Sequence, residues 1–330
     1  MHGCAVRRAV NVRHTLRLDD ARPPRAQNVR MLDALAEPLR RALLGQVRRL
    51  TAAEGRRVDF SRPPGAAGWY TPQDVCWRVH ADFVPMLVGG VRALLLQALH
   101  PLALAAVWDH SDLQGDLSAR LGRTALFIAA TTYGTAVMAE DAVARVRAVH
   151  AHVRGTAPDG RAYAADDPAL LRYVHLTEVG SFLDAWRLLG GPRLAPAQCD
   201  RYYAETARVA EALGAVAVPR TQTQALAELE AMRPQLAGGE RPRAVLALLR
   251  GLGRGSARRR LNRPFVEAGV ALLPPWARAL YGLPAVDRRR DALLLAAVRP
   301  SVPLLRWALR EGVAAQAARR LAADADGRPP

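Results

Sequence analysis

The sequence predicts an all-α protein, and three features of its composition support that fold class. Half of the 330 residues are hydrophobic, which is enough to bury a substantial core. Aromatic residues make up only 5% of the chain, so the core has to be built from aliphatic side chains. Alanine, leucine and arginine dominate, and runs of β-branched residues are few, which favours helix over strand. We therefore expect a single multi-helix domain, with room for one short β-hairpin.

The expected domain boundaries follow from where helical periodicity begins and ends. Residues 1–30 are polar and arginine-rich without periodicity, and predict a flexible N-terminal tail. Met31, itself a candidate start of translation, opens an amphipathic segment that runs to about Glu54, with Pro38 as a kink or a later start of the helix. No internal repeat and no long linker follows. We expect one helical domain over residues 31–322 and a frayed tail over residues 323–330.

Proline, glycine and aspartate divide the rest of the chain into helices and turns. We expect a loop around Pro63-Pro64-Gly65 and a short hairpin around the turn signal Pro158-Asp159-Gly160. Asp116 and Pro168 stand where helices should start. The segments predicted to be helical are 74–84, 86–99, 102–108, 116–133, 140–153, 168–189 and 196–218, followed by shorter helices from Thr221 to Ala322.

The formal net charge of +17 would ordinarily indicate a nucleic acid or an anionic surface as partner. All 47 basic residues are arginines, however, because the sequence contains no lysine. Exclusive arginine with abundant alanine and glycine is typical of a GC-rich coding sequence. The charge is spread along the chain, and no helix-turn-helix, zinc-finger or aromatic-basic pattern accompanies it. We therefore expect no nucleic-acid partner.

Compartment and membrane contact are predicted from the cysteines and the most apolar segment. The three cysteines, Cys4, Cys76 and Cys199, form no CxxC motif and no disulfide framework, and no secretory signal precedes them. These features indicate a cytoplasmic protein. The most apolar segment, Phe83 to Trp108, is interrupted by proline, glycine and charged residues. We expect a buried core helix there and no transmembrane segment, and we leave peripheral membrane contact open.

Standard catalytic motifs are missing from the sequence, which leaves the histidines as the informative residues. There is no Walker loop, no GxSxG and no HExxH, and the glycines from Gly251 to Gly255 do not follow a predicted strand. Five of the eight histidines fall within or beside predicted apolar helices: His80, His100, His110, His150 and His175.

His150 projects from an apolar stripe of its predicted helix. The stripe consists of Val143, seven residues before His150, Val146, four residues before it, and Val153, three residues after it. Positions at this spacing share one helical face. His152 is rotated by about 200° and belongs to the polar side. A buried neutral imidazole needs a partner for its nitrogens. That partner is either a haem iron, for which histidine is a common ligand, or a backbone carbonyl of the core.

Polar side chains on two further predicted helices are candidates for the same site. Arg120 and Thr124 stand at i and i+4 on a face that soon becomes apolar, where they could hold a carboxylate or polarise a bound ligand. The alternative is a solvated helix start with a snorkelling arginine. Arg92 and His100 lie in the apolar run from Gly89 to Pro101 and would be costly to bury unpaired. Helix packing with a capping histidine explains them equally well.

Two histidines have mainly structural explanations. His110 lies in the expected turn after residue 108 and serves as well for capping as for binding. His175 and Glu178 stand at i and i+3, so the carboxylate could orient the imidazole or relay protons. A structural ion pair is the commoner reason for this spacing.

Several short motifs in a consistent order resemble the MpaB-type oxygenases, a family that includes the latex-clearing proteins, also called rubber oxygenases. The resemblance is close over about residues 68–189 and extends to about residue 310. The segments that carry it are GWYTP at 68–72, CWRVH at 76–80, GGVRALLLQALHP at 89–101, DHSD at 109–112, RLGRT at 120–124, TYG at 132–134, RVRAVH at 145–150 and VRGT at 153–156.

The resemblance implies a mostly helical domain that binds one haem b. His150, in the RVRxxH element, would be the proximal iron ligand, and Arg120 and Thr124, in the RxxxT element, would help to form the haem pocket. The residue before that threonine is a distal lysine in some rubber oxygenases, and here it is Arg123. Rubber oxygenases also use an upstream glutamate as a base, whereas this sequence has no glutamate between His80 and Glu140.

From these observations we expect a haem-b-dependent oxygenase or oxidase that acts on a small apolar, lipid-like or isoprenoid-like substrate. Its partners would be dioxygen and an unidentified electron donor. His150 would hold the iron, and Arg120, Thr124, His100 and Arg92 would surround the cofactor. Arg123 would be the catalytic cation that stabilises the distal ligand. The competing hypotheses are a non-catalytic haem carrier or sensor and a basic helical protein that docks on membranes or partners.

Overall fold

The computed structural model describes residues 37–38, 40–41, 43–45, 58–112, 115–253 and 255–323. The chain forms two compact units, residues 1–42 and 43–330. The described residues between 37 and 45 are helical, and the remainder of the helix predicted from Met31 to Glu54 lies outside the described residues. The tail predicted over residues 1–30 and nearly all of the one predicted over residues 323–330 lie outside them too. The helices and strands from α2 onward all belong to the second unit.

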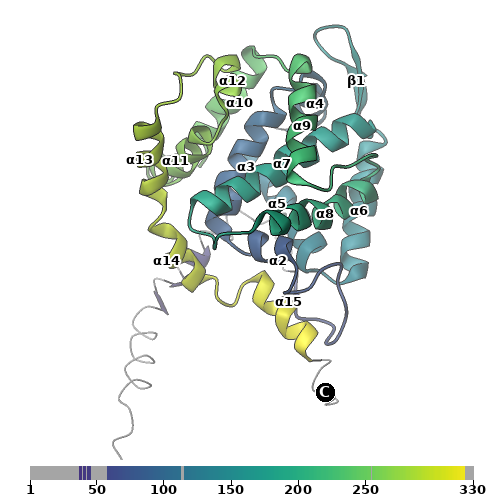
Figure 1. The fold of residues 1–330 in the computed structure, drawn as a ribbon, viewed down its shortest axis with the longest axis vertical. Coiled ribbons are helices and arrows are strands. Elements are labelled where there is room, and N and C mark those ends of the chain that lie inside the picture. Colours follow the sequence, from purple (N-terminus) through teal and green to yellow (C-terminus); the bar gives the residue numbers. More distant parts are fainter. Residues whose placement is uncertain are drawn as a thin grey trace, which may run out of the picture. The chain divides into compact units, whose positions relative to one another are not determined.

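The second unit is almost entirely helical, as the composition predicts (Figure 1). Its elements are α2 (Val75–His80), α3 (Phe83–Gln97), α4 (Pro101–His110), α5 (Leu117–Tyr133), α6 (Ala136–His150), β1 (Arg154–Thr156), β2 (Ala162–Ala164), α7 (Pro168–Leu188), α8 (Pro196–Leu213), α9 (Gln222–Met232), the 3₁₀ turn η1 (Arg233–Gln235), α10 (Glu240–Arg250), α11 (Ser256–Ala271), α12 (Pro275–Leu280), α13 (Arg288–Val298), α14 (Ser301–Ala308) and α15 (Val313–Ala322). The strands pair antiparallel with Gly155 opposite Tyr163, which confirms the predicted hairpin.

Side-chain caps explain where several helices begin. Helices α5 and α7 start where Asp116 and Pro168 predict, and the carboxylates of Asp116 and Asp167 accept backbone N–H groups at these starts. The helix predicted from Glu140 starts four residues earlier, because the Thr135 hydroxyl caps it by accepting the N–H of Met138. The helix predicted to reach residue 218 ends at Leu213, because Gly214 adopts a left-handed conformation with φ of 113°.

The predicted interruption at Pro101 is confirmed and changes the direction of the chain. Helix α3 ends at Gln97, and α4 starts at Pro101, where a missing backbone N–H costs nothing. Together the two helices are bent by 105°. A break was also expected before Pro85, but α3 already begins at Phe83 and carries Pro85 in its first turn, which tolerates proline for the same reason.

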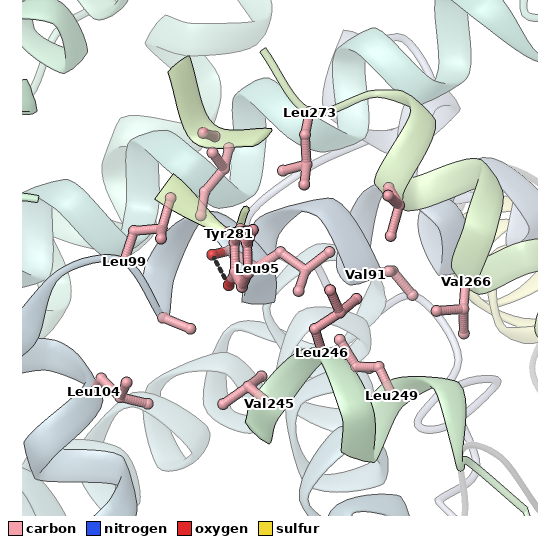
Figure 2. Close-up of a cluster of buried hydrophobic side chains, with 14 of the residues drawn as sticks. Val91, Leu95, Leu99, Leu104, Val245, Leu246, Leu249, Val266, Leu273 and Tyr281 are labelled. Atoms are coloured by element: carbon pink, nitrogen blue, oxygen red, sulfur yellow. Dashed lines mark hydrogen bonds between the residues drawn. The ribbon is translucent and has the colours of Figure 1, made fainter. Parts of the chain in front are cut away.

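The interior of the unit is organised around α3 and α7, which make the most extensive helix pair (Figure 1). Gly89 permits this contact, since a Cβ there would lie 2.8 Å from the carbonyl oxygen of Ser181 on α7. On one side of the pair α10, α11 and α12 close an aliphatic core, in which the hydroxyl of Tyr281 donates to the carbonyl of Leu95 over 2.7 Å (Figure 2). This cluster is mostly aliphatic, as the composition predicts, but the second large cluster is not, because Trp77, Tyr133, Phe182, Trp186 and Tyr202 are buried in it.

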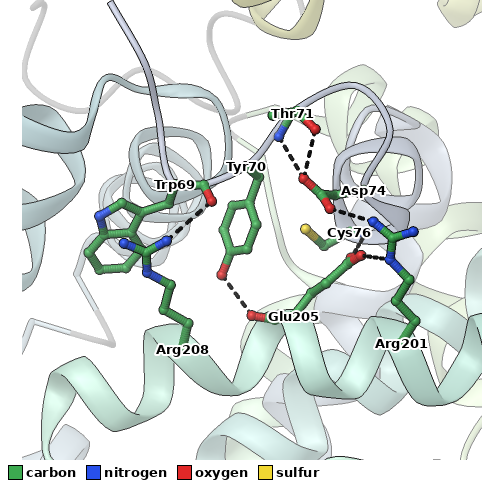
Figure 3. A network of polar contacts seen from close by, with 8 residues as sticks. All are labelled: Trp69, Tyr70, Thr71, Asp74, Cys76, Arg201, Glu205 and Arg208. Carbon is green, nitrogen blue, oxygen red and sulfur yellow. Dashed lines mark hydrogen bonds and ion pairs between the residues drawn. The ribbon is translucent and has the colours of Figure 1, made fainter.

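On the other side, α2, α5 and α8 pack together, and a polar network fixes the short helix α2 (Figure 3). The Glu205 carboxylate on α8 accepts the backbone N–H of Cys76 over 2.8 Å and pairs with Arg201 over 2.6 Å. Arg201 also pairs with Asp74, whose carboxylate accepts from Thr71. This network anchors the start of the helix that ends at His80.

Two helical segments of the described residues have the length and apolar composition of a membrane span. One is the run Arg288–Ala322, which is divided into α13, α14 and α15, and 22% of its apolar window is buried. The other is the bent pair α3 and α4, which reaches the necessary length only if both helices are counted together. Helix α3 is largely buried within the fold, as the sequence predicts for this segment.

Candidate functional site

A small apolar cavity lies among α3, α4, α5, α6, α7 and α10, and two of the predicted site residues line it. Its volume is about 140 Å³. His150 and Arg120 contribute its charged or titratable side chains, and Gln97 adds an amide. The other lining residues are apolar: Leu94, Ala98, Ala103, Leu104, Ala106, Val107, Ala165, Leu170, Leu171, Val174 and Val245. The structure therefore brings together an imidazole and a guanidinium that are 30 residues apart.

His150 reaches the cavity from the last turn of α6 and lacks a hydrogen-bond partner there. Its Nδ1 atom is buried and unpaired within the described residues. Burial lowers the pKa of the imidazole, and the charge of Arg120 lowers it further against the opposing effect of Asp166. His152 is exposed and bonds the Ala148 carbonyl over 2.8 Å, so it lies on the polar side as predicted. The alternative of a core histidine bonded to a backbone carbonyl does not describe His150.

Arg120 is a half-buried cation that forms no ion pair with a described carboxylate. Its Nη1 atom donates to the Ser111 hydroxyl over 3.3 Å. Burial lowers the pKa of the guanidinium, and the neighbouring charge of Arg123 adds to this effect. A guanidinium in such surroundings gains most from an anionic ligand, because two parallel N–H groups can bind one carboxylate.

The other two predicted site residues of the RLGRT segment, Arg123 and Thr124, are not part of the cavity wall. Both are exposed. The Thr124 hydroxyl donates to the Arg120 carbonyl over 3.2 Å, one turn back on the same helix. In this structure only Arg120 among the three faces the cavity, so the roles expected of Arg123 and Thr124 stay predictions.

Arg92 and His100 lie near the cavity without lining it. Arg92 points from α3 to α7, where its Nη1 atom pairs with Asp184 over 2.9 Å. His100 is the residue before α4, is only 3% exposed and packs on the Tyr173 ring with the centroids 5.1 Å apart. Its Nδ1 atom is buried without a partner. The ion pair occupies the Nη1 atom of Arg92, while its buried Nε atom has no partner among the described residues, and His100 keeps an unpaired nitrogen beside the bend between α3 and α4.

His110 has structural partners. Its Nε2 atom lies 3.1 Å from both the Arg154 carbonyl and the Tyr163 hydroxyl of the hairpin. The Tyr163 hydroxyl in turn donates to Asp109 over 2.9 Å. These contacts hold the end of α4 against the hairpin, which is the structural alternative considered for this histidine.

A second group of titratable side chains, half-buried apart from the fully buried Tyr202, lies where α2, α5, α7 and α8 meet. The ring nitrogens of His80 lie 3.0 Å from the Thr132 hydroxyl and 3.1 Å from the Tyr202 hydroxyl. Burial lowers the pKa of His80 to about 3, with a further contribution from His175, and lowers that of His175 to about 4. Burial raises the pKa of Glu178 to about 7. At neutral pH both imidazoles are uncharged.

The pairing expected between His175 and Glu178 is not formed. No hydrogen bond or ion pair joins them in the described part of the chain, and the buried Nε2 atom of His175 has no partner. A spacing of i and i+3 places two residues on adjacent parts of a helix surface, but side-chain rotamers decide whether they meet. Glu178 thus becomes a candidate functional residue on its own, which the sequence suggested only as a partner of His175.

Between His80 and Glu140, where the sequence has no glutamate, the carboxylates are four aspartates, and all four have other contacts. Asp82 pairs with Arg306, Asp109 accepts from Tyr163, and Asp112 and Asp116 cap backbone N–H groups. None of them lines the cavity. Among the described residues, no three His, Cys, Asp or Glu side chains gather around a position for a bare metal ion. A larger hollow of about 440 Å³ near Arg187 and Arg193 contains none of the predicted site residues and is open to solvent.

The sequence comparisons assign this helical fold to a class of oxygenase catalytic domains. The family model described as "ER-bound oxygenase mpaB/B'/Rubber oxygenase, catalytic domain" matches residues 77–321. The chain belongs to this family and is therefore an oxidoreductase of the oxygenase class, as its motifs predict. No curated protein and no solved structure matches the chain.

Proposed function

We propose that this oxygenase holds haem b in the cavity beside His150 and oxidises a small apolar substrate with dioxygen. The observation that carries the proposal is the pair formed by the unpaired His150 imidazole and the Arg120 guanidinium, which both line one apolar cavity. A haem would bring its own porphyrin ligands to the iron, so the protein would have to supply only one further iron ligand and a cation for the propionates. The side chains present supply both.

The chemistry of the lining residues suits haem, but the cavity is too small to hold it without widening. Small-molecule sites usually measure about 300–1,000 Å³, whereas this cavity measures about 140 Å³. Haem binding therefore has to widen it. Helix α4 contributes two alanines, Leu104 and Val107 to the wall and follows the bend at Pro101, so a shift of this helix is one way in which the cavity could open.

Each residue of the cavity has a defined role in this proposal. The bound haem supplies the redox chemistry that activates dioxygen. His150 holds an imidazole nitrogen toward the cavity in its neutral, ligating form, because burial and Arg120 both disfavour its protonation. Arg120 neutralises a carboxylate of the cofactor. The aliphatic side chains from α3, α7 and α10 exclude water and accept an apolar substrate.

The test is an absorption spectrum of the purified protein after haemin addition, compared between the wild type and two variants. We expect a Soret band in the wild type that is lost or shifted in His150→Ala. His152→Ala is the matched control, since His152 lies two residues away on the exposed side of the chain and should leave the band unchanged.

Each alternative outcome has a definite meaning. A wild-type protein without a Soret band would overturn the haem assignment. A band that His150→Ala leaves unchanged would keep the cofactor and move the ligand, with His100 as the first alternative because its Nδ1 atom is also unpaired. Haem binding without dioxygen consumption in the presence of terpenoid or lipid substrates would instead indicate a carrier or sensor.

A further inference from the structure

Helices α11 and α13 pack against each other at one side of the second unit and carry exposed arginines that have no acidic partner (Figure 1). Within the described part of the chain, no ion pair or side-chain hydrogen bond involves Arg258, Arg259, Arg260 and Arg263 on α11 or Arg288, Arg289 and Arg290 on α13. These seven arginines, with the exposed leucines Leu261 and Leu293 of the same two helices, are called the α11–α13 surface below.

The acidic residues of this region leave the charge of the arginines almost uncompensated. Glu267 on α11 pairs with an arginine of α10 over 2.9 Å, and the buried Asp291 on α13 pairs with an arginine of α12 over 2.7 Å. Asp287 accepts two backbone N–H groups at the start of α13. Among the described residues of α11, α13 and their caps, only the Asp287 carboxylate is left to oppose the seven guanidiniums.

The same surface exposes apolar side chains. Leu293 is 71% exposed and Leu261 is 55% exposed. Around Leu293, the side chains of Ala292, Ala296 and Ala297 are exposed as well, and their spacing places all four residues on one side of α13. Single exposed leucines are ordinary, but an apolar side that begins one turn after exposed arginines is the pattern of a helix that lies in a membrane interface.

The helices at this surface are too short to cross a membrane and are held by the fold. A transmembrane helix needs about 20 apolar residues, whereas α13 has 11 residues and α14 has 8. Val302 and Leu305 of α14 are buried in a core cluster, and Arg306 pairs with Asp82. Only the exposed side of this helical run is available to a partner, so contact with a bilayer would be peripheral.

We propose that the α11–α13 surface docks this protein on an anionic phospholipid bilayer. The arginines bind the headgroups, and Leu293 enters the boundary between headgroups and acyl chains. A nucleic acid would bind the arginines alone and would leave Leu293 and the neighbouring alanines in water, so the apolar side of α13 favours the bilayer. The inference does not depend on the cofactor. It adds that an apolar substrate of the kind proposed above would be met where it concentrates.

The experiment measures co-sedimentation of the full chain with phosphatidylcholine vesicles that contain or lack phosphatidylserine. We expect binding only to the vesicles that contain phosphatidylserine, and release at high salt, because the Debye length falls from about 10 Å at 0.1 M salt to about 3 Å at 1 M. A wild type that does not bind the anionic vesicles at 0.1 M salt would overturn the proposal.

A charge variant tests the arginines. Replacing Arg288, Arg289 and Arg290 together by glutamine should weaken vesicle binding by about 10²-fold, because each arginine near an anionic bilayer contributes about fivefold. The control removes the same charge from exposed arginines of α2, α6 and α15, namely Arg78, Arg145 and Arg319. If the control loses as much affinity as the variant, the net charge of the protein explains the binding and the α11–α13 surface is not the docking site.

An apolar variant separates the bilayer from other polyanions. Leu293→Ser should weaken vesicle binding by at least about fivefold, because the leucine is buried only in the docked state. The matched control is Leu226→Ser on α9, where the leucine is 56% exposed, and it should bind like the wild type. If Leu293→Ser keeps the wild-type affinity and the wild type binds duplex DNA as tightly as the vesicles, the surface is a general polyanion site and the proposal is wrong. None of these measurements needs haemin, so they leave the proposed function to its own test.

Discussion

Arg120 is the residue on which binding of an anionic ligand should depend most. It is half-buried, lines the cavity and has no described carboxylate as partner. Charge-assisted hydrogen bonds contribute about 1.5–3 kcal/mol each. We therefore expect Arg120→Gln to weaken haemin binding by roughly 10- to 100-fold. A titration followed at the Soret band measures this, with Arg145→Gln, an exposed arginine on α6, as control. Unchanged affinity in Arg120→Gln would remove Arg120 from the cofactor site.

Glu178 should also make the stability of the protein depend on pH, with a sign set by its raised pKa. The pKa of about 7 in the folded state lies above the usual 4.5 of a glutamate, so the unfolded chain releases the proton first as the pH rises. The wild type should lose roughly 3 kcal/mol of unfolding free energy between about pH 4.5 and pH 7. Glu178→Gln should not show this loss. Urea unfolding measures the unfolding free energies of the wild type and Glu178→Gln at pH 5 and at pH 8. If the two proteins differ by the same amount at both pH values, the expected titration of Glu178 is contradicted.

The imidazoles of His80 and His175 change the stability with pH in the opposite direction to Glu178: they stabilise the fold more as the pH rises. His80 and His175 have pKa values of about 3 and 4 in the fold, below the usual 6.5. The unfolded chain therefore binds their protons first as the pH falls, and the stability that these groups contribute is present above about pH 6.5 and lost below it. Acid sensitivity below pH 6 is thus expected even in Glu178→Gln, which keeps both histidines.

At the scale of the elements, the close packing of α3 on α7 can be tested at two neighbouring glycines of α3, Gly89 and Gly90, of which only the first lies close against α7. A Cβ at Gly89 would lie 2.8 Å from the Ser181 carbonyl oxygen and 3.0 Å from the Phe182 backbone, whereas Gly90 has open space. Alanine is favoured over glycine within a helix by about 1 kcal/mol. Gly90→Ala should therefore stabilise the protein by up to that amount, and Gly89→Ala should destabilise it by about 1–3 kcal/mol through overpacking. Thermal unfolding of both variants tests this, and equal shifts would contradict the close packing of α3 on α7.

Helix α2 shows how tertiary contacts stabilise an element that its own sequence could not. It has six residues and no side-chain cap, and isolated helices of this length are unstable. The Glu205 carboxylate on α8 accepts the Cys76 N–H and thereby replaces the missing cap (Figure 3). The network around Arg201 and Asp74 then fixes the direction in which α2 presents His80 to Tyr202.

At the scale of the whole second unit, Arg320 connects α15 with segments far away in the sequence. It is only 1% exposed, and its guanidinium donates to the carbonyls of Phe60, Ala66 and Gly134. Arg320→Ala would leave three buried carbonyls without donors, and we expect it to cost at least about 3 kcal/mol of unfolding free energy. Arg319→Ala, an exposed neighbour, should cost less than about 0.5 kcal/mol. Urea unfolding compares them, and similar losses would contradict the role of Arg320.

The sequence by itself determined the helical class, the hairpin, most helix boundaries and the apolar side of α6 that carries His150. These features depend on local rules, namely periodicity, capping residues and proline or glycine breaks, which neighbouring residues specify completely. The motif order also indicated the oxygenase family that the family model confirms over residues 77–321. Boundaries went wrong where a single cap or glycine, such as Thr135 or Gly214, moved the end of a helix.

Only the tertiary structure decided which of the candidate side chains meet. Arg120 shares the cavity with His150, whereas Arg92 is paired with Asp184 and Arg123 faces solvent. Glu178 does not bind His175 and instead follows Val174 along the cavity face of α7. A helical pattern assigns a residue to a face of its own helix, but it does not say which helix packs against that face. Partners, burial and pKa values depend on that packing, and for this reason they appear only in the folded chain.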